Sequence, residues 1–316
     1  MNIEKIFDYT RENNISDIHL LEGEKIYFRK DGEIIEYDGT DTVSKEELLE
    51  ICNGKIEEDF SYTDSKSQRY RVNSFLTRGK LALVIRIINK EPIKLKGKFI
   101  NKLIDEKILS LKDGLVLVTG ITGSGKSTTL ANIIEKLNRN KNLKILTIED
   151  PIEYIFENKK SLIIQRELGK DVESFEKALK SSLRQDPDVI ILGEIRDEES
   201  LYSALKLAET GHLVFSTLHT MNTVESVNRL ISMVRSEKKD FIREQLASVL
   251  RFILSEELYR GKRIIPIFEI LNNTKAVANL ILNNKLNQIP TLIESGIENF
   301  MITKEKYLKN LETESD

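Results

Sequence analysis

Hydrophobic and polar positions alternate over much of the first 90 residues, and this period of two predicts β-strands. A helix is predicted before them over residues 2–13, because Ile3, Ile6 and Phe7 fall on one helical face. Lys30-Asp31-Gly32 separates two of the alternating segments, and its Asp-Gly pair favours a hairpin turn. The predicted strands are 16–20, 25–29, 33–37, 69–75 and 81–88. We therefore predict a small α+β domain over residues 1–90.

The pattern changes after this domain. Residues 91–98 are rich in lysine and carry Pro92 and Gly97, so we predict a linker there. From residue 99 to residue 316, apolar runs alternate with segments of helical period. This alternation predicts an α/β domain with strands buried on both faces and with C-terminal helices. The apolar runs are 115–118, 145–148, 189–192 and 213–215, and the helical stripes are 174–184 and 199–209.

Composition excludes several classes of protein. Of the 316 residues, 40% are hydrophobic and 31% are charged, as in ordinary globular proteins. The 48 basic and 51 acidic residues give a net charge of -3, so no overall basic field predicts nucleic-acid binding. Cys52 is the one cysteine, which excludes an intrachain disulfide. The sequence has no run of 18 apolar residues and no signal-peptide pattern at its start, so we expect a cytosolic protein.

A phosphate-binding loop is predicted between the first apolar run and the helix that follows it. The loop reads Gly120-Ile121-Thr122-Gly123-Ser124-Gly125-Lys126-Ser127, which has the spacing Gly-x-x-x-x-Gly-Lys-Ser. Strand, loop and helix in this order place a phosphate at a helix N-terminus, and the glycines let backbone N–H groups approach it. Lys126 is expected to bind the β- and γ-phosphates of ATP, and Ser127 to coordinate Mg²⁺. Thr128 completes the predicted nucleotide-binding set.

Acidic residues follow two of the other apolar runs. Glu194 lies just after the run 189–192, where a Walker B strand places a carboxylate that supports Mg²⁺, in part through water. The run 145–148 is followed by Glu149 and, beyond Pro151, by Glu153. Hydrolysis needs a group that positions or activates water, and the spacing alone leaves the choice between Glu149 and Glu153 open.

Two histidines bracket the last apolar run, with His212 before it and His219 after it. A zinc site would need further ligands, and His19 is the only other histidine in the sequence. We therefore expect His212 and His219 to sense the γ-phosphate by hydrogen bonding.

The order of these blocks resembles the secretion ATPase superfamily of type II secretion and type IV pili. Residues 120–127, 147–153, 183–197 and 210–220 are similar to its Walker A, Asp-box, Walker B and His-box motifs. Residues 16–20, 29–32 and 70–75 resemble the PAS-like N-terminal domain of pilus retraction ATPases. The resemblance covers nearly the whole chain. It implies a RecA-like P-loop ATPase core preceded by a small α+β PAS-like domain.

The resemblance also implies roles for individual residues in the motifs. It implies that Lys126 binds phosphate and that Glu194 supports Mg²⁺. It selects Glu153 over Glu149 as the group that polarises the attacking water, and it makes His212 and His219 sensors of the nucleotide state. The implied catalytic set is therefore a pair of acids and a pair of histidines, to which arginines are added.

Arginines of the N-terminal domain are expected from the resemblance alone. Arg69, Arg71, Arg78 and Arg86 fall where retraction ATPases supply arginines to a bound nucleotide, some of them across a subunit boundary. A guanidinium can stabilise charge on the transferring phosphoryl group, which is worth about 10³- to 10⁵-fold in rate. The resemblance further implies a homohexamer on the cytoplasmic face of the inner membrane. Its implied partner is an integral membrane platform protein of the pilus.

Two segments depart from the family pattern. Retraction members carry Ala-Ile-Arg-Asn-Leu-Ile-Arg near the C-terminus, whereas residues 276–282 read Ala-Val-Ala-Asn-Leu-Ile-Leu, with neither arginine. Residues 254–258 read Leu-Ser-Glu-Glu-Leu, with an acid where the family usually has glutamine. Pilus retraction is the leading hypothesis, and pilus or pseudopilus assembly is the alternative.

Two further classes of protein are weighed against these. A ring-shaped DNA-translocating motor is disfavoured because the sequence has no basic stripe with interleaved aromatic residues. A regulatory protein that binds nucleotide but hydrolyses little is disfavoured by the intact Lys126, Glu153 and Glu194.

Overall fold

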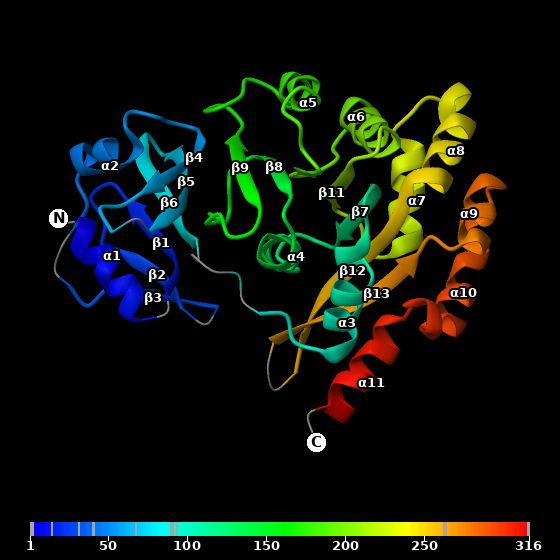
Figure 1. Cartoon of the computed structure of the whole chain (residues 1–316). Helices are drawn as coiled ribbons and strands as arrows, with labels where there is room; N and C mark the ends of the chain where they lie inside the picture. Colours follow the sequence, from blue (N-terminus) through cyan, green and yellow to red (C-terminus); the bar gives the residue numbers. More distant parts are fainter. Residues whose placement is uncertain are drawn as a thin grey trace. The chain divides into compact units, whose positions relative to one another are not determined.

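The computed structural model describes residues 3–13, 15–30, 32–39, 42–66, 68–88, 92, 94–261 and 264–314. The chain divides into two compact units (Figure 1). The first unit comprises Met1–Glu91 together with Pro151–Ile155, and the second comprises Pro92–Asp150 and Phe156–Asp316. The segment that follows β8 (Lys144–Glu149) therefore belongs to the first unit, although its flanking residues belong to the second.

The first unit is built on an antiparallel sheet. Over its described residues the sheet has six strands in the order β3-β2-β1-β6-β5-β4. The helix predicted over residues 2–13 is confirmed from residue 3 to residue 12, and it buries Ile6 and Phe7 in the core of this unit. Its elements are α1 (Ile3–Glu12), β1 (Ile15–Leu21), β2 (Tyr27–Lys30), β3 (Glu33–Glu36), α2 (Lys45–Cys52), β4 (Asp59–Thr63), β5 (Arg69–Thr77) and β6 (Lys80–Ile88).

The strands predicted from alternation are confirmed in this unit. The predicted segments 69–75 and 81–88 lie within β5 and β6, which pair along their whole length. The segments 25–29 and 33–37 overlap β2 and β3, which form the predicted hairpin. Asp31 of the predicted turn lies outside the described residues, as do residues 89–91 and 93 at the predicted linker and residues 315 and 316 at the chain end.

A buried carboxylate organises the connection between β4 and β5. The side chain of Asp64 is fully buried and accepts hydrogen bonds from the backbone N–H groups of Lys66 (2.9 Å) and Gln68 (2.8 Å). It also accepts a hydrogen bond from the hydroxyl of Tyr70 (2.9 Å) and forms an ion pair with Arg11 of α1. One side chain therefore ties the loop, β5 and α1 together.

The second unit is built on a larger sheet that is mostly parallel. Its described residues form seven strands in the order β13-β12-β7-β11-β10-β8-β9, with β13 antiparallel to β12 and the other pairs parallel. All six residues of β7 are buried, as expected for a parallel strand covered on both faces. The strands are β7 (Gly114–Thr119), β8, β9 (Leu162–Glu167), β10 (Val189–Leu192), β11 (Leu213–Leu218), β12 (Leu250–Arg260) and β13 (Ile264–Asn272).

Helices cover both faces of this sheet (Figure 1). Leu115 and Leu117 of β7 join one apolar cluster with residues of α5 to α10, and Val116 and Val118 join a second cluster with residues of α3, α4 and α11. Alternate residues of one strand thus support opposite layers. The helices are α3 (Lys98–Glu106), α4 (Lys126–Asn140), α5 (Phe175–Ser182), α6 (Glu198–Glu209), α7 (Thr223–Ser232), α8 (Lys239–Val249), α9 (Lys275–Leu282), α10 (Ile289–Ser295) and α11 (Lys304–Glu314).

The apolar runs predicted as strands are confirmed as β7, β8, β10 and β11, and the two helical stripes are confirmed as α5 and α6. The region after α6 contains more than the predicted C-terminal helices, because β12 and β13 extend the sheet beyond β7. Within the described ranges, no helix is both long and apolar enough to cross a membrane.

The hydrogen bonds of Asp64 predict a large loss of stability on its removal. Asp64→Ala removes a buried acceptor from two backbone N–H groups and from the side chains of Tyr70 and Arg11. We expect the free energy of unfolding to fall by about 3 kcal/mol. Hydrogen–deuterium exchange of β4 and β5 should report this cost as faster exchange. Asp59→Ala is the matched control, because Asp59 is half-exposed and lies 3.9 Å from Arg71. Equal exchange in the two variants would contradict the role given to Asp64.

Candidate active site

The phosphate loop, residues 120–127, joins β7 to α4. Gly120 donates its backbone N–H to the carbonyl of Leu218 at the end of β11 (3.2 Å), which fixes the start of the loop against the neighbouring strand. Lys126 is buried, and its Nζ donates to the carbonyls of Gly120 (2.8 Å) and Ile121 (2.9 Å). The ammonium group therefore lies within the loop that a phosphate would enter.

Glycine is required at two positions of this loop by close packing. Gly125 has φ 106°, and a Cβ atom there would lie 2.4 Å from Oε1 of Glu256. A Cβ atom at Gly120 would lie 2.4 Å from the carbonyl oxygen of Glu256. Both distances are far below van der Waals contact, so β12 packs against the loop from behind and leaves no room for a larger residue.

The front of the loop fits an anion. α4 begins directly after Gly125, which has no side chain that could cap the helix, so a phosphate at this point would face the positive end of the helix. Ser124 Oγ is buried and makes no hydrogen bond within the described ranges. A Cβ atom at Gly123 would meet no atom within 4 Å, which leaves the tip of the loop open. These donors suit phosphate oxygens.

The parallel sheet brings the predicted acids to the same edge as the loop. β11 lies between β7 and β10, and β8 lies beyond β10. The three strands β8, β10 and β11 are parallel to β7, so the residues that follow them share one edge of the sheet. Glu149, Glu194 and His219 stand at the ends of these strands. This edge is therefore the candidate active site.

His219 connects the Walker B acid to the phosphate loop. Its Nε2 lies 3.1 Å from Oε2 of Glu194, and its Nδ1 lies 3.4 Å from the hydroxyl of Thr122. The imidazole can donate from only one ring nitrogen when neutral, so its partners fix its tautomer. A phosphate that enters the loop would change the surroundings of His219 and, through it, those of Glu194.

The remaining acids of this edge have partners of their own. Glu194 also forms an ion pair with Arg196, which lies 3.5 Å from Asp150. Oε1 of Glu149 accepts hydrogen bonds from the hydroxyl of Thr147 (2.6 Å) and from Nε2 of Gln165 (3.3 Å). Glu149 is thus held against its own strand and against β9.

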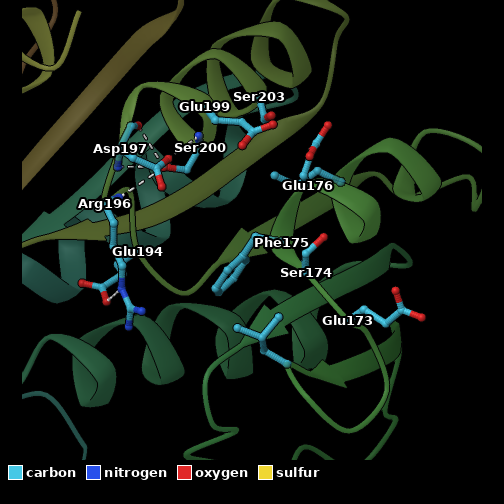
Figure 2. Close-up of a pocket in the computed structure, with 12 residues that line it drawn as sticks. Glu173, Ser174, Phe175, Glu176, Glu194, Arg196, Asp197, Glu199, Ser200 and Ser203 are labelled. Atoms are coloured by element: carbon cyan, nitrogen blue, oxygen red, sulfur yellow. Dashed lines mark hydrogen bonds and ion pairs between the residues drawn. The ribbon is translucent and has the colours of Figure 1, made fainter.

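A hollow of about 310 Å³ opens beside Glu194, between the start of α5 and the start of α6. Figure 2 shows Glu194 and Arg196 on one side of it and Glu176 on the other. The neighbouring Glu176 carboxylate raises the pKa of Glu199, whereas hydrogen bonds from Ser200 lower the pKa of Asp197. The hollow has an acidic lining, which is unfavourable for anionic phosphates. Its acidic lining residues are Glu173, Glu176, Glu194, Asp197 and Glu199.

His212 lies apart from this site within the chain, so its role as a sensor of the nucleotide stays a prediction. It precedes β11 and lies at the opposite edge of the sheet from the phosphate loop. Its Nδ1 lies 3.2 Å from the carbonyl of Leu207 and 3.2 Å from the hydroxyl of Thr210. These contacts place the ring at the C-terminal end of α6, which is a structural position.

Glu153 and the candidate arginines belong to the first unit. Arg71 Nη1 lies 4.0 Å from Oε1 of Glu153, and Arg69 donates from Nε to the carbonyl of Ile152 (3.1 Å). These two residues of β5 therefore hold the segment that carries the predicted water-polarising acid. The segment is tied to β5 by both a backbone and a side-chain contact.

The other two arginines have different surroundings in the first unit. Arg86 forms an ion pair with the buried Asp17 (2.7 Å), so its guanidinium joins β6 to β1. Arg78 lies in the turn between β5 and β6 with φ 51°.

Sequence reasoning gave no role to Glu256, which the structure places directly behind the phosphate loop. Its side chain is 2% exposed, and its Oε2 accepts a hydrogen bond from the hydroxyl of Thr129 (2.8 Å). Burial raises the pKa of the Glu256 carboxyl to about 8, against weaker opposing effects of Thr129 and Lys126. An acid two residues after the apolar run 252–254 is the signal that could have identified it.

Comparison with known proteins agrees with this geometry. Residues 2–266 match the family model described as type II/IV secretion system protein. The type IV pilus retraction ATPase PilT of Pseudomonas aeruginosa is 36% identical over 98% of this chain and 94% of its own length. The twitching motility protein of Neisseria gonorrhoeae is 41% identical over 85% of this chain and 73% of its own length.

A solved structure is similar over the same extent. The crystal structure of the pilus retraction motor PilT with bound ADP covers 98% of this chain and 97% of its own, with a TM-score of 0.84 and 34% identity. The mixed α/β architecture of this chain, with its mostly parallel sheet, matches that structure. On these grounds the chain belongs to the type II/IV secretion system protein family and is an ATP hydrolase of that family.

Proposed function

We propose that this protein is the motor that retracts type IV pili, using the energy of ATP hydrolysis. The observation that carries the proposal is the near full-length similarity to a pilus retraction ATPase, combined with an intact phosphate loop and Walker B acid. The chain acts as a homohexamer on the cytoplasmic face of the inner membrane, and its partner is an integral membrane platform protein of the pilus. Retraction removes pilin subunits from the base of the pilus.

Each residue of the site has a proposed part in hydrolysis. Lys126 and the backbone of the loop bind the phosphates, and Ser127 with Glu194 would hold Mg²⁺, Glu194 through water. Mg²⁺ would supply positive charge to the phosphate oxygens. His219 reports occupation of the loop to Glu194, because it contacts both of them. Ser127 and Glu194 would offer oxygen ligands, which Mg²⁺ prefers.

Glu153 is the proposed group that polarises the attacking water. Its carboxylate lies 4.0 Å from Nη1 of Arg71 on β5. Arg71 and Arg78 are the proposed sources of positive charge from the N-terminal domain, whereas Arg86 is committed to Asp17. Assembly into a ring lets a neighbouring subunit complete each site and couples hydrolysis to domain movement.

Loss of Lys126 or of the Glu194 charge should abolish turnover. In Lys126→Ala and in Glu194→Gln, steady-state phosphate release should fall by about 100-fold or more, close to background. Lys136→Ala is the matched control, because Lys136 lies on the same helix and pairs with Asp105 at the surface (2.8 Å). Phosphate release at the rate of the unmodified protein in either site variant would refute the site.

The two candidate acids after β8 can be separated by kinetics. Glu153→Gln should lower kcat by about 10²- to 10⁴-fold while ADP binding is retained, because the carboxylate acts on water rather than on the bound phosphates. Glu149→Gln should lower kcat far less, since Glu149 is held by Thr147 and Gln165. Single-turnover measurement of both variants decides the assignment. A larger loss in Glu149→Gln would transfer the role to that residue.

Pilus or pseudopilus assembly is the second candidate function. It is favoured by one observation, the absence of both arginines from residues 276–282, which form most of α9. A polymerising motor would use the same hydrolysis site, so the ATPase assays above cannot separate the two directions.

Deletion of the gene separates the two directions of force. If the protein retracts pili, the deletion strain should carry an excess of pili that do not shorten, since assembly continues without removal. Electron microscopy and live imaging of labelled pili would measure this, with the Lys126→Ala gene and the unmodified gene as complements. A strain without visible pili would instead support assembly.

A further inference from the structure

Glu256 is an ionisable side chain in the interior of the ATPase core that the roles proposed above do not use. It lies on β12 with 2% of its surface exposed, on the side of the sheet that faces α4. An ionised carboxylate without a close cation is costly to bury, so its charge state affects whatever packs against it. The phosphate loop is what packs against it.

Both ends of the loop touch Glu256. Its Oε1 occupies the space where a Cβ atom of Gly125 would lie, and its carbonyl oxygen occupies the corresponding space at Gly120. Its Oε2 accepts the hydrogen bond from Thr129 in the first turn of α4. The carboxyl group therefore supports the N-terminal turn of α4 on the side opposite to the phosphate.

Among the residues that the structure describes, few charges surround the carboxyl group. Lys126 of α4 is the cation that acts on it, and Nζ of Lys126 is bound to the loop carbonyls. The residue of β13 in register with it is Phe268, and β7 carries no ionisable side chain. Glu257, the next residue along β12, is directed to Lys304 of α11 (2.8 Å).

We propose that Glu256 is a positioning residue of the phosphate loop, that it supports nucleotide binding as a neutral carboxylic acid, and that its ionisation weakens this binding. A negative charge behind the first turn of α4 would compete with phosphate for the positive end of the helix and for Lys126. The neutral acid supplies the same shape and accepts the same hydrogen bond without that competition. The inference rests on nucleotide binding by the loop and not on the direction of the motor.

The direction of the pH effect follows from linkage. Burial raises the pKa of Glu256 to about 8, so the neutral form dominates below that pH and the ionised form above it. A bound nucleotide is itself anionic and raises the pKa of Glu256 further. Binding above pH 8 must therefore take up a proton, and affinity falls as the pH rises.

The test is ADP binding by isothermal titration calorimetry between pH 7 and pH 9, at fixed Mg²⁺ and ionic strength. ADP is chosen because its own phosphates are already ionised in this range. For the unmodified protein the Kd should rise about tenfold more over this interval than for Glu256→Gln, which keeps the shape and cannot ionise. Titrations in two buffers of different ionisation enthalpy should show proton uptake at pH 8.5 that Glu256→Gln abolishes.

Two further variants test whether the pH dependence comes from Glu256. Glu257→Gln, which removes a neighbouring carboxylate from the same strand, should keep the pH dependence of the unmodified protein. Thr129→Val removes the donor that favours the ionised form, so it should move the loss of affinity to higher pH. The same pH dependence and proton uptake in Glu256→Gln and the unmodified protein would overturn the proposal. A shift to lower pH in Thr129→Val, or loss of ADP binding by Glu256→Gln at pH 7, would also overturn it.

Discussion

Parallel strands that are covered on both faces have little room for charged side chains along their length, so the chemistry must gather where the strands end. Every residue of β7 and of β11 is buried, and the loop after β7 carries the residues proposed to bind phosphate. Glu194 and His219 follow neighbouring strands at the same edge. The contact of His219 with both Glu194 and Thr122 is a direct result of that arrangement.

The same constraint explains the balance of charge around the site. The acids beside Glu194 gather in the hollow next to α5 and α6, whereas the loop presents N–H groups and Lys126. His219 stands between these two environments. Glu256 is an exception, since it lies within the covered layer, and there a carboxyl group is most stable when it is neutral.

Local sequence signals predicted much of the ATPase core. The apolar runs became β7, β8, β10 and β11, and the phosphate loop was recognisable because its residues are contiguous. Sequence reasoning gave His212 and His219 the same role because they flank one strand. The six residues of β11 separate them by about 20 Å, which places the two rings at opposite edges of the sheet. Residue type and spacing alone do not show this separation. It becomes clear only when the residues between the histidines are recognised as one strand that crosses the sheet.

Long-range contacts account for the rest of what sequence reasoning missed. The partner of Arg86 is Asp17, 69 residues away, and Glu256 meets Thr129 from 127 residues away. Neither contact leaves a periodic signal. The strands β12 and β13 were not predicted for a related reason. They come late in the sequence, but they pair beside β7, which is the first strand of this sheet in the chain.

The assignment of Pro151–Ile155 to the first unit has a consequence for how the chain can be divided. The polypeptide passes between the two units three times, after residues 91, 150 and 155. Residues 1–91 therefore do not make up the whole of the first unit and cannot be exchanged as an independent domain. Removing or exchanging them would take Arg69 and Arg71 away from the segment of Glu153. In a chimera with a foreign N-terminal domain, that segment would lack both contacts. We expect a functional chimera to keep both units from the same protein.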